Sequence, residues 1–230
     1  MINYRLNDDI AYLEMDDGKA NVFSIPMSRR LRELLSRAQD EAKATVIVGR
    51  DRQFSAGYDL SVMQSGDAKA MAAMVVEGFE MLCQLAAHPQ PTLAACNGNA
   101  MGLGAFILLV SDTRIGADID CKISLPETRG GMQFVPLLVT AAKARLSHAK
   151  YIEAALQSQI YSPSGAVEAG FLDQVVNADQ LLEHTTAVAQ TLMQLPGATY
   201  ARNKQDLLAS KLKSMQKNLA EIKANPMILA

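Results

Sequence analysis

An α/β fold is predicted from the order of the apolar segments along the chain. Short apolar runs typical of buried strands, such as "ATVIVG" at 44–49 and "PTLAAC" at 91–96, alternate with longer segments whose apolar residues recur at helical spacing. The 230-residue chain is long enough to bury a core of ordinary size. Its hydrophobic fraction of 49% and charged fraction of 20% are typical of a globular protein.

A hairpin and a helix are predicted at the start of the chain. Residues 2–6 and 10–15 suit two short strands around the turn "NDD". Ser28 is expected to cap the helix that follows them, because Ser can accept a hydrogen bond from a first-turn amide. The remaining elements are expected, in chain order, to be a strand at 44–49, the loop "RDRQFSAGYDL" at 50–60, a helix at 67–87, a strand at 91–96, a glycine turn, a helix at 102–111, strands at 113–118 and 121–125, helices at 136–146 and 147–157, a short helix from 162 that Gly170 stops, a further strand, and helices at 179–195 and 199–224.

Charge and cysteine content exclude several classes of function. A net charge of −2 lacks the basic excess that nucleic-acid binding requires, and the apolar windows are too short to span a membrane. Cys83, Cys96 and Cys121 are odd in number and widely spaced, which favours free thiols in a reducing compartment. We therefore expect a cytoplasmic protein without nucleic-acid or membrane partners. The three histidines have no metal-ligand spacing, so no metal site is predicted.

The stretch "NGNAMGLGAFILLVSD", residues 97–112, runs from a glycine cluster into an apolar helix. Helix starts of this kind commonly bind phosphate through free amides and the helix dipole. The spacing of Gly98, Gly102 and Gly104 fits neither the dinucleotide fingerprint nor the P-loop, and no Lys-Ser or Lys-Thr pair follows. A group other than phosphate is therefore expected at these amides.

Two motifs carry a family resemblance. The loop "FSAGYDL" at 54–60 has the pattern F-x-A-G-x-D-L after an apolar strand, and the glycine stretch continues as "SDTRIGAD…ISLPETRGG". Together they resemble the crotonase family, the enoyl-CoA hydratases and isomerases, whose motifs are N-G-x-A-x-G-x-G, C-D-x-R-I-A and P-E-x-x-x-G. The order and separations also fit, over roughly residues 2–176.

This resemblance implies an architecture and a ligand class. It implies a crotonase-like spiral of ββα units at 1–195 and a helical C-terminal segment at 196–230 that takes part in trimer formation. It implies an acyl-CoA substrate from fatty acid metabolism, with coenzyme A as part of the substrate and no tightly bound cofactor. The assembly that it implies is a homotrimer or a dimer of trimers.

The resemblance also implies what the glycine-rich helix start binds. In the family, two backbone amides bind the thioester carbonyl oxygen, and the matching positions here are Tyr58 and Leu103. Removing the α-proton of a thioester moves negative charge onto that oxygen, which two amides and a helix N-terminus stabilise. Leu103 stands where glycine is usual, and it would be strained if the turn required a positive φ at that residue.

Family hydratases use two glutamates to hold and activate a water, and only one of them is present here. Phe106 occupies the first position and Glu127 the second. A phenyl ring cannot accept a proton from water, whereas a single carboxylate can shift a double bond from Δ3 to Δ2. Phe106, Met132 and Phe134 are expected to line the substrate pocket and to raise the pKa of Glu127 by desolvation. An isomerase is therefore favoured over a hydratase.

Further residues are predicted to bind coenzyme A on less specific grounds. Ala56, Arg52 and Asp59 belong to or precede the first motif, and Asp59 also reads as a structural hydrogen-bond acceptor. Three lysines of the last helix could meet the coenzyme A phosphates, although exposed lysines are commonly just solvated. These lysines are Lys204, Lys211 and Lys213.

Three alternatives stay open at this point. Glu127 follows Pro126, an arrangement typical of the exposed first turn of a helix. A hydratase, lyase or hydrolase reaction could use the same oxyanion site with another acid or base. A catalytically weak scaffold that binds coenzyme A is also compatible with the departures from the family pattern at Leu103 and Phe106.

Overall fold

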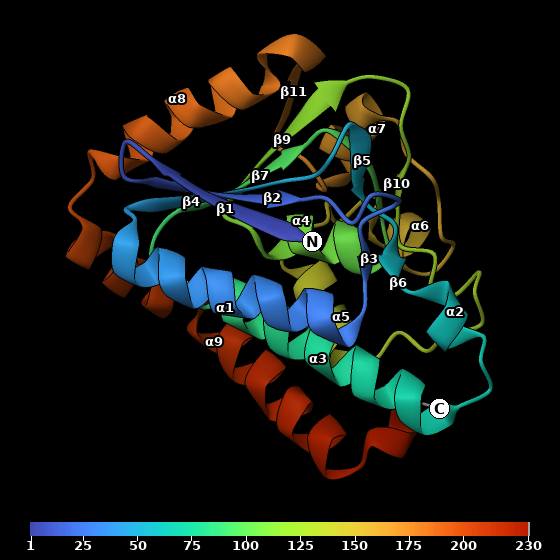
Figure 1. Ribbon diagram of the computed structural model, residues 1–230. Coiled ribbons are helices and arrows are strands. Elements are labelled where there is room, and N and C mark those ends of the chain that lie inside the picture. Colours follow the sequence, from blue (N-terminus) through green and yellow to red (C-terminus); the bar gives the residue numbers. More distant parts are fainter. Residues whose placement is uncertain (230) are drawn as a thin grey trace.

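The computed structural model describes residues 1–229, and its centre is a six-stranded sheet. The first two strands of the sheet pair antiparallel and the others are parallel, which places the carboxyl ends of the parallel strands at one edge (Figure 1). In spatial order the strands are β1 (Ile2–Asn7), β2 (Ile10–Met15), β4 (Ala44–Val48), β7 (Thr92–Cys96), β9 (Thr113–Asp118) and β11 (Gln174–Asn177).

A second, small parallel sheet continues the strands of the first one. It contains β10 (Ile123–Ser124), β8 (Gly98–Met101) and β5 (Arg52–Ser55), and β3 (Val22–Phe23) pairs with β6 (Gly57–Tyr58) beside it. The chain therefore repeats one unit: a strand in the large sheet, a short strand in a small sheet, and then a helix. This repetition is the predicted spiral of ββα units.

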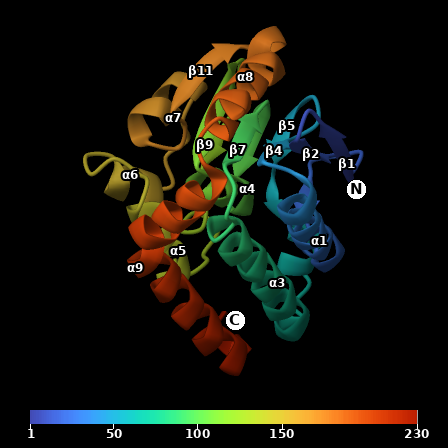
Figure 2. The ribbon, with the colours of Figure 1, turned by 90° about the vertical axis from the view of Figure 1, so that its left-hand side faces the viewer.

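Helices cover both faces of the large sheet. Helix α8 covers one face, where Leu181 and Ala189 pack on side chains of β2, β4, β7 and β9. Figure 1 shows this helix above the sheet and α1 and α3 below it, and Figure 2 shows the same arrangement from the side. The helices are α1 (Ile25–Glu41), α2 (Leu60–Met63), α3 (Ala68–Ala86), α4 (Leu103–Val110), α5 (Pro136–Lys143), α6 (Tyr151–Ala155), α7 (Pro163–Ala169), α8 (Leu181–Met193) and α9 (Gly197–Ala224), with 3-10 turns at Ala178–Gln180 and Pro226–Leu229.

The C-terminal helix α9 packs on α3 and α5 of the same chain. Met215 and Ile222 are buried in this contact, and Lys223 forms an ion pair with Glu80 of α3 at 2.5 Å. The 3-10 turn η2 (Pro226–Leu229) then also contacts α3. The last segment of the described chain is thus part of the same packed structure, and the division at residue 195 stays a prediction.

The first helix begins earlier than predicted. Ser24, not Ser28, is the N-cap, and its hydroxyl accepts from the amide of Met27 at 3.4 Å. Pro26 fits the first turn because its missing amide would have had no helical partner there. Ser28 lies buried inside the helix.

Several other boundaries also differ from the prediction. The supposed loop at 50–60 and the glycine turn contain β5, β6 and β8, whose partners are distant in sequence. Residues 147–157 form only the short helix α6, and α5 ends at Lys143. The helix expected from residue 179 begins at Leu181, after a 3-10 turn. Along residues 1–229, no helix has the length and apolarity needed to cross a membrane.

Candidate active site

The glycine-rich start of α4 leaves the amide of Leu103 without an acceptor inside the helix. Gly102 is the N-cap with a φ of +52°, and Leu103 is the first helical residue. The positive φ falls on Gly102, so the strain that the sequence suggested for Leu103 does not arise. A first-turn amide has no intrahelical acceptor, and every residue of α4 is buried. The Leu103 amide and the positive end of the helix dipole therefore act in a poorly hydrated environment.

The Tyr58 amide lies next to this helix start. Phe23 pairs with Tyr58 in parallel register and accepts from the amide of Asp59 at 3.2 Å. Because successive amides of a strand point to opposite edges, the Tyr58 amide points away from β3. A Cβ built on Gly57 would lie 3.3 Å from the nitrogen of Leu103, so β6 and the start of α4 are in close contact.

Glu127 faces the same region from a tight turn. Its side chain is only 6% exposed, and Oε1 lies 3.5 Å from the position of a Cβ built on Gly102. Within residues 1–229, Oε2 has no hydrogen-bond partner. The turn is held by the amide of Met132, which donates to the Glu127 carbonyl at 2.8 Å, and by Arg129, which donates to the Ser158 carbonyl at 2.9 Å. The alternative of an exposed first helical turn is therefore wrong.

Burial changes the acidity of both ionisable groups that line the site. Desolvation raises the pKa of Glu127 from its usual 4.5 to about 7, against a smaller lowering effect of its own backbone amide. Burial, and secondarily the Glu127 carboxylate, raise the pKa of Tyr58 well above its usual 10. The Tyr58 hydroxyl donates to the Val75 carbonyl at 3.0 Å, which fixes the ring against α3.

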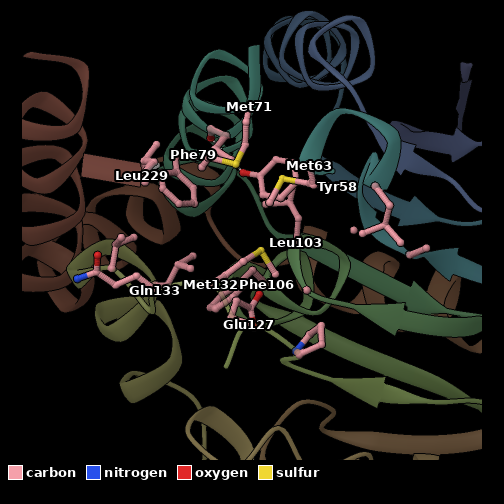
Figure 3. A pocket seen from close by; sticks show the side chains of 18 residues that line it. Tyr58, Met63, Met71, Phe79, Leu103, Phe106, Glu127, Met132, Gln133 and Leu229 are labelled. Atoms are coloured by element: carbon pink, nitrogen blue, oxygen red, sulfur yellow. Dashed lines mark hydrogen bonds between the residues drawn. The ribbon is translucent and has the colours of Figure 1, made fainter. Parts of the chain in front are cut away.

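These groups border one apolar cavity of about 120 Å³ (Figure 3). Among the described residues that line it, Glu127 is the one carboxylate. Phe106 and Met132 line the cavity as predicted. Phe134, which was also expected there, does not line it, because its ring packs against Phe106 at a centroid distance of 5.7 Å. The arrangement offers two amides and one poorly solvated carboxyl group to a ligand with an apolar part.

The family relationship that the motifs indicate is decided by a match along nearly the whole chain: residues 5–227 fit the model of the enoyl-CoA hydratase/isomerase family. The chain belongs to this family. A probable enoyl-CoA hydratase of Rhodobacter capsulatus is 29% identical over 212 residues, which cover 87% of this chain and 78% of the relative. An enoyl-CoA hydratase/isomerase family protein of Pseudomonas syringae has a TM-score of 0.93 at 28% identity, with 97% of each chain covered.

A Mycobacterium tuberculosis protein is a further structural neighbour, described both as a probable enoyl-CoA hydratase and as an enoyl-CoA isomerase. Its two structures give TM-scores of 0.92 and 0.91 at 29% and 28% identity, covering 97% of this chain and 94% and 98% of theirs. These neighbours confirm the predicted crotonase-like fold of an enoyl-CoA hydratase/isomerase family member. The family acts on coenzyme A thioesters.

The residues predicted to bind coenzyme A in this family member lie in different places. Ala56 lines the cavity. Arg52 lies on the exposed surface, where its guanidinium donates to the Asp120 carbonyl at 3.1 Å, and it does not line the cavity. Asp59 caps α2 by accepting from the amide of Ser61 at 2.9 Å, as its structural interpretation predicts.

The three lysines of α9 that could meet the coenzyme A phosphates differ in their burial. Lys204 is buried and forms an ion pair with Asp112 at 2.6 Å, so it is already engaged within the fold. Burial is also the main reason why the pKa of Lys211 is lowered to about 8. Lys213 is exposed. A role for Lys204 at the coenzyme A phosphates is therefore excluded by its burial and pairing.

Sequence reasoning missed much of the cavity wall. Met63, Met71 and Phe79 line the cavity from α2 and α3, and Leu229 lines it from η2. Phe79 lies in the helix predicted at 67–87, but helical spacing does not indicate that it lines a cavity. The spacing of residues along the chain gives no signal that Leu229 returns to this site, because that contact is between distant segments.

Proposed function

We propose that this chain is an acyl-CoA isomerase that shifts the double bond of a 3-enoyl-CoA to the 2-position, with Glu127 as its single base. The observation that carries the proposal is the pairing of one buried carboxylate with Phe106, which stands where family hydratases have a second glutamate. Water activation by two carboxylates has no second partner among the described residues that line the cavity.

The proposed reaction needs only groups that border the cavity. Glu127 takes a proton from C2, the C3–C4 π electrons become delocalised, and negative charge collects on the thioester oxygen. The amides of Tyr58 and Leu103 donate hydrogen bonds to that oxygen, which lowers the barrier most in a dry site. The same carboxylic acid then returns the proton to C4, so that atoms and charge balance and no water is consumed.

The pKa of Glu127 sets the expected pH dependence. The base must be deprotonated to remove a proton, and its pKa is about 7 because of burial. We expect kcat/KM for 3-hexenoyl-CoA to be constant at alkaline pH and to fall about tenfold per pH unit below the pKa. A pH–rate profile checks this; a midpoint near the 4.5 of an ordinary glutamate would contradict it.

A hydratase is the second candidate, because curated relatives have hydratase and dehydratase names. The names of the structural neighbours do not separate the two reactions, since the M. tuberculosis protein carries both. Parallel assays of the wild-type chain with 3-hexenoyl-CoA and 2-hexenoyl-CoA separate them. We expect conversion of the first to a conjugated thioester at least about tenfold faster than hydration of the second. Faster hydration would overturn the isomerase proposal.

Assembly into a homotrimer or a dimer of trimers belongs to the same proposal. Leu195 and Leu207, at the turn before α9 and on α9 itself, are 48% and 84% exposed in the single chain. Exposed leucines of this kind are consistent with a subunit contact. A cytoplasmic location is likewise proposed, on the basis of the three buried free thiols.

A further inference from the structure

One end of the cavity is closed by the last turn of the described chain. Leu229 lines the cavity from η2, beside Phe79 of α3, and η2 packs on α3. Figure 3 shows Leu229 next to Phe79 on the side of the cavity away from Leu103, with Met71 between Phe79 and Tyr58. Leu229, Phe79 and Met71 are apolar, whereas Gln133, which also lines the cavity, is polar, so this end is mainly apolar and suits hydrocarbon.

A thioester bound as proposed has its acyl carbons in this part of the cavity. Its oxygen lies at the amides of Tyr58 and Leu103, and its C2 faces Glu127. The remaining apolar space leads to Leu229. The cavity of about 120 Å³ is slightly smaller than the roughly 150 Å³ that accommodates one benzene molecule.

We propose that Leu229 is a specificity-determining residue that restricts the substrate to short acyl chains of about four to six carbons. This inference rests on the proposed placement of the thioester but not on which reaction follows. The side chain acts as the end wall: each methylene added within the cavity gains burial, and methylenes beyond Leu229 have no space.

Binding of saturated thioesters, which cannot react, tests the inference separately from the activity. Calorimetry with butanoyl-, hexanoyl-, octanoyl- and decanoyl-CoA should show affinity rising by up to about fourfold per added methylene until hexanoyl-CoA. Decanoyl-CoA should bind the wild-type chain at least about tenfold more weakly than hexanoyl-CoA. Equal or tighter binding of decanoyl-CoA overturns the inference, as does absence of binding of all four ligands.

A smaller and a larger side chain at Leu229 should change the longest acyl chain that the cavity accepts in opposite directions. Leu229→Ala should raise the affinity for decanoyl-CoA about tenfold. Leu229→Phe should lower the affinity for hexanoyl-CoA about tenfold and leave the affinity for butanoyl-CoA unchanged. Ile228→Ala is the matched control, because Ile228 is adjacent, 51% exposed and not in the cavity wall. If Leu229→Ala and Ile228→Ala give the same chain-length profile, Leu229 does not set the limit.

Discussion

Glu127→Gln is expected to lower kcat for 3-hexenoyl-CoA by about a thousandfold, since a positioned general base contributes on that scale. The amide has nearly the same shape as the carboxylic acid, but it cannot accept the C2 proton. Formation of the conjugated thioester, followed by its ultraviolet absorbance, measures the loss. Hexanoyl-CoA should still bind, because the amides of Tyr58 and Leu103 and the apolar wall are unchanged.

The same substitution should stabilise the folded chain above neutral pH. The folded pKa of Glu127 is raised to about 7 from 4.5, so its ionisation opposes folding as the pH rises between these values. At pH 8 this penalty amounts to roughly 3 kcal/mol of unfolding free energy, and glutamine removes it. Denaturant unfolding at pH 5 and pH 8 should show that Glu127→Gln raises the unfolding free energy mainly at the higher pH.

Glu168→Gln is the control for both measurements. Glu168 lies exposed on α7, and it makes none of the ion pairs found among the described residues. Its substitution should change neither kcat nor the pH dependence of stability. If Glu127→Gln were as active as Glu168→Gln, the base would have to be another group and the mechanism would be wrong.

The parts of the site that could be predicted are those in which neighbouring residues determine the chemistry. The motif around Gly57, the start of α4 and the P-E turn predicted that Tyr58, Leu103 and Glu127 come together, and all three line the cavity. The predicted environment of Glu127 also agrees with its burial and raised pKa. Strands β4 and β7 of the large sheet were predicted because each is a continuous apolar run.

The parts that could not be predicted depend on contacts between distant segments. The short strands β5 and β8 contain Arg52, Gln53 and Asn99, and they are strands because they pair with each other and, for β8, with β10. In the sequence, Lys204 looks like any solvated lysine of a helix, because its partner Asp112 belongs to a distant part of the chain. Leu229 becomes part of the cavity only because α9 folds back along α3.

Gly57→Ala is expected to reduce kcat by about a hundredfold to a thousandfold, which is the effect of losing one oxyanion donor. Gly57 has a φ of +88°, and a Cβ there would lie 2.8 Å from the Met101 carbonyl oxygen and 3.3 Å from the Leu103 nitrogen. The first distance requires a backbone shift, because the obstructing atom is not part of a flexible side chain. That shift separates β6 from the start of α4, and hence the Tyr58 amide from the Leu103 amide.

Gly18→Ala separates this geometric effect from ordinary backbone strain. Gly18 has a φ of +78° and does not line the cavity, and apart from its chain neighbours no atom of residues 1–229 lies within 4 Å of a Cβ built on it. Both variants should lose about 1 kcal/mol of stability from the unfavourable φ. Only Gly57→Ala should have a lower kcat. Its affinity for hexanoyl-CoA should change much less than its kcat, because the charge on the oxygen develops in the transition state. Equal kcat values in the two variants would mean that the Tyr58 and Leu103 amides do not act together on the thioester oxygen.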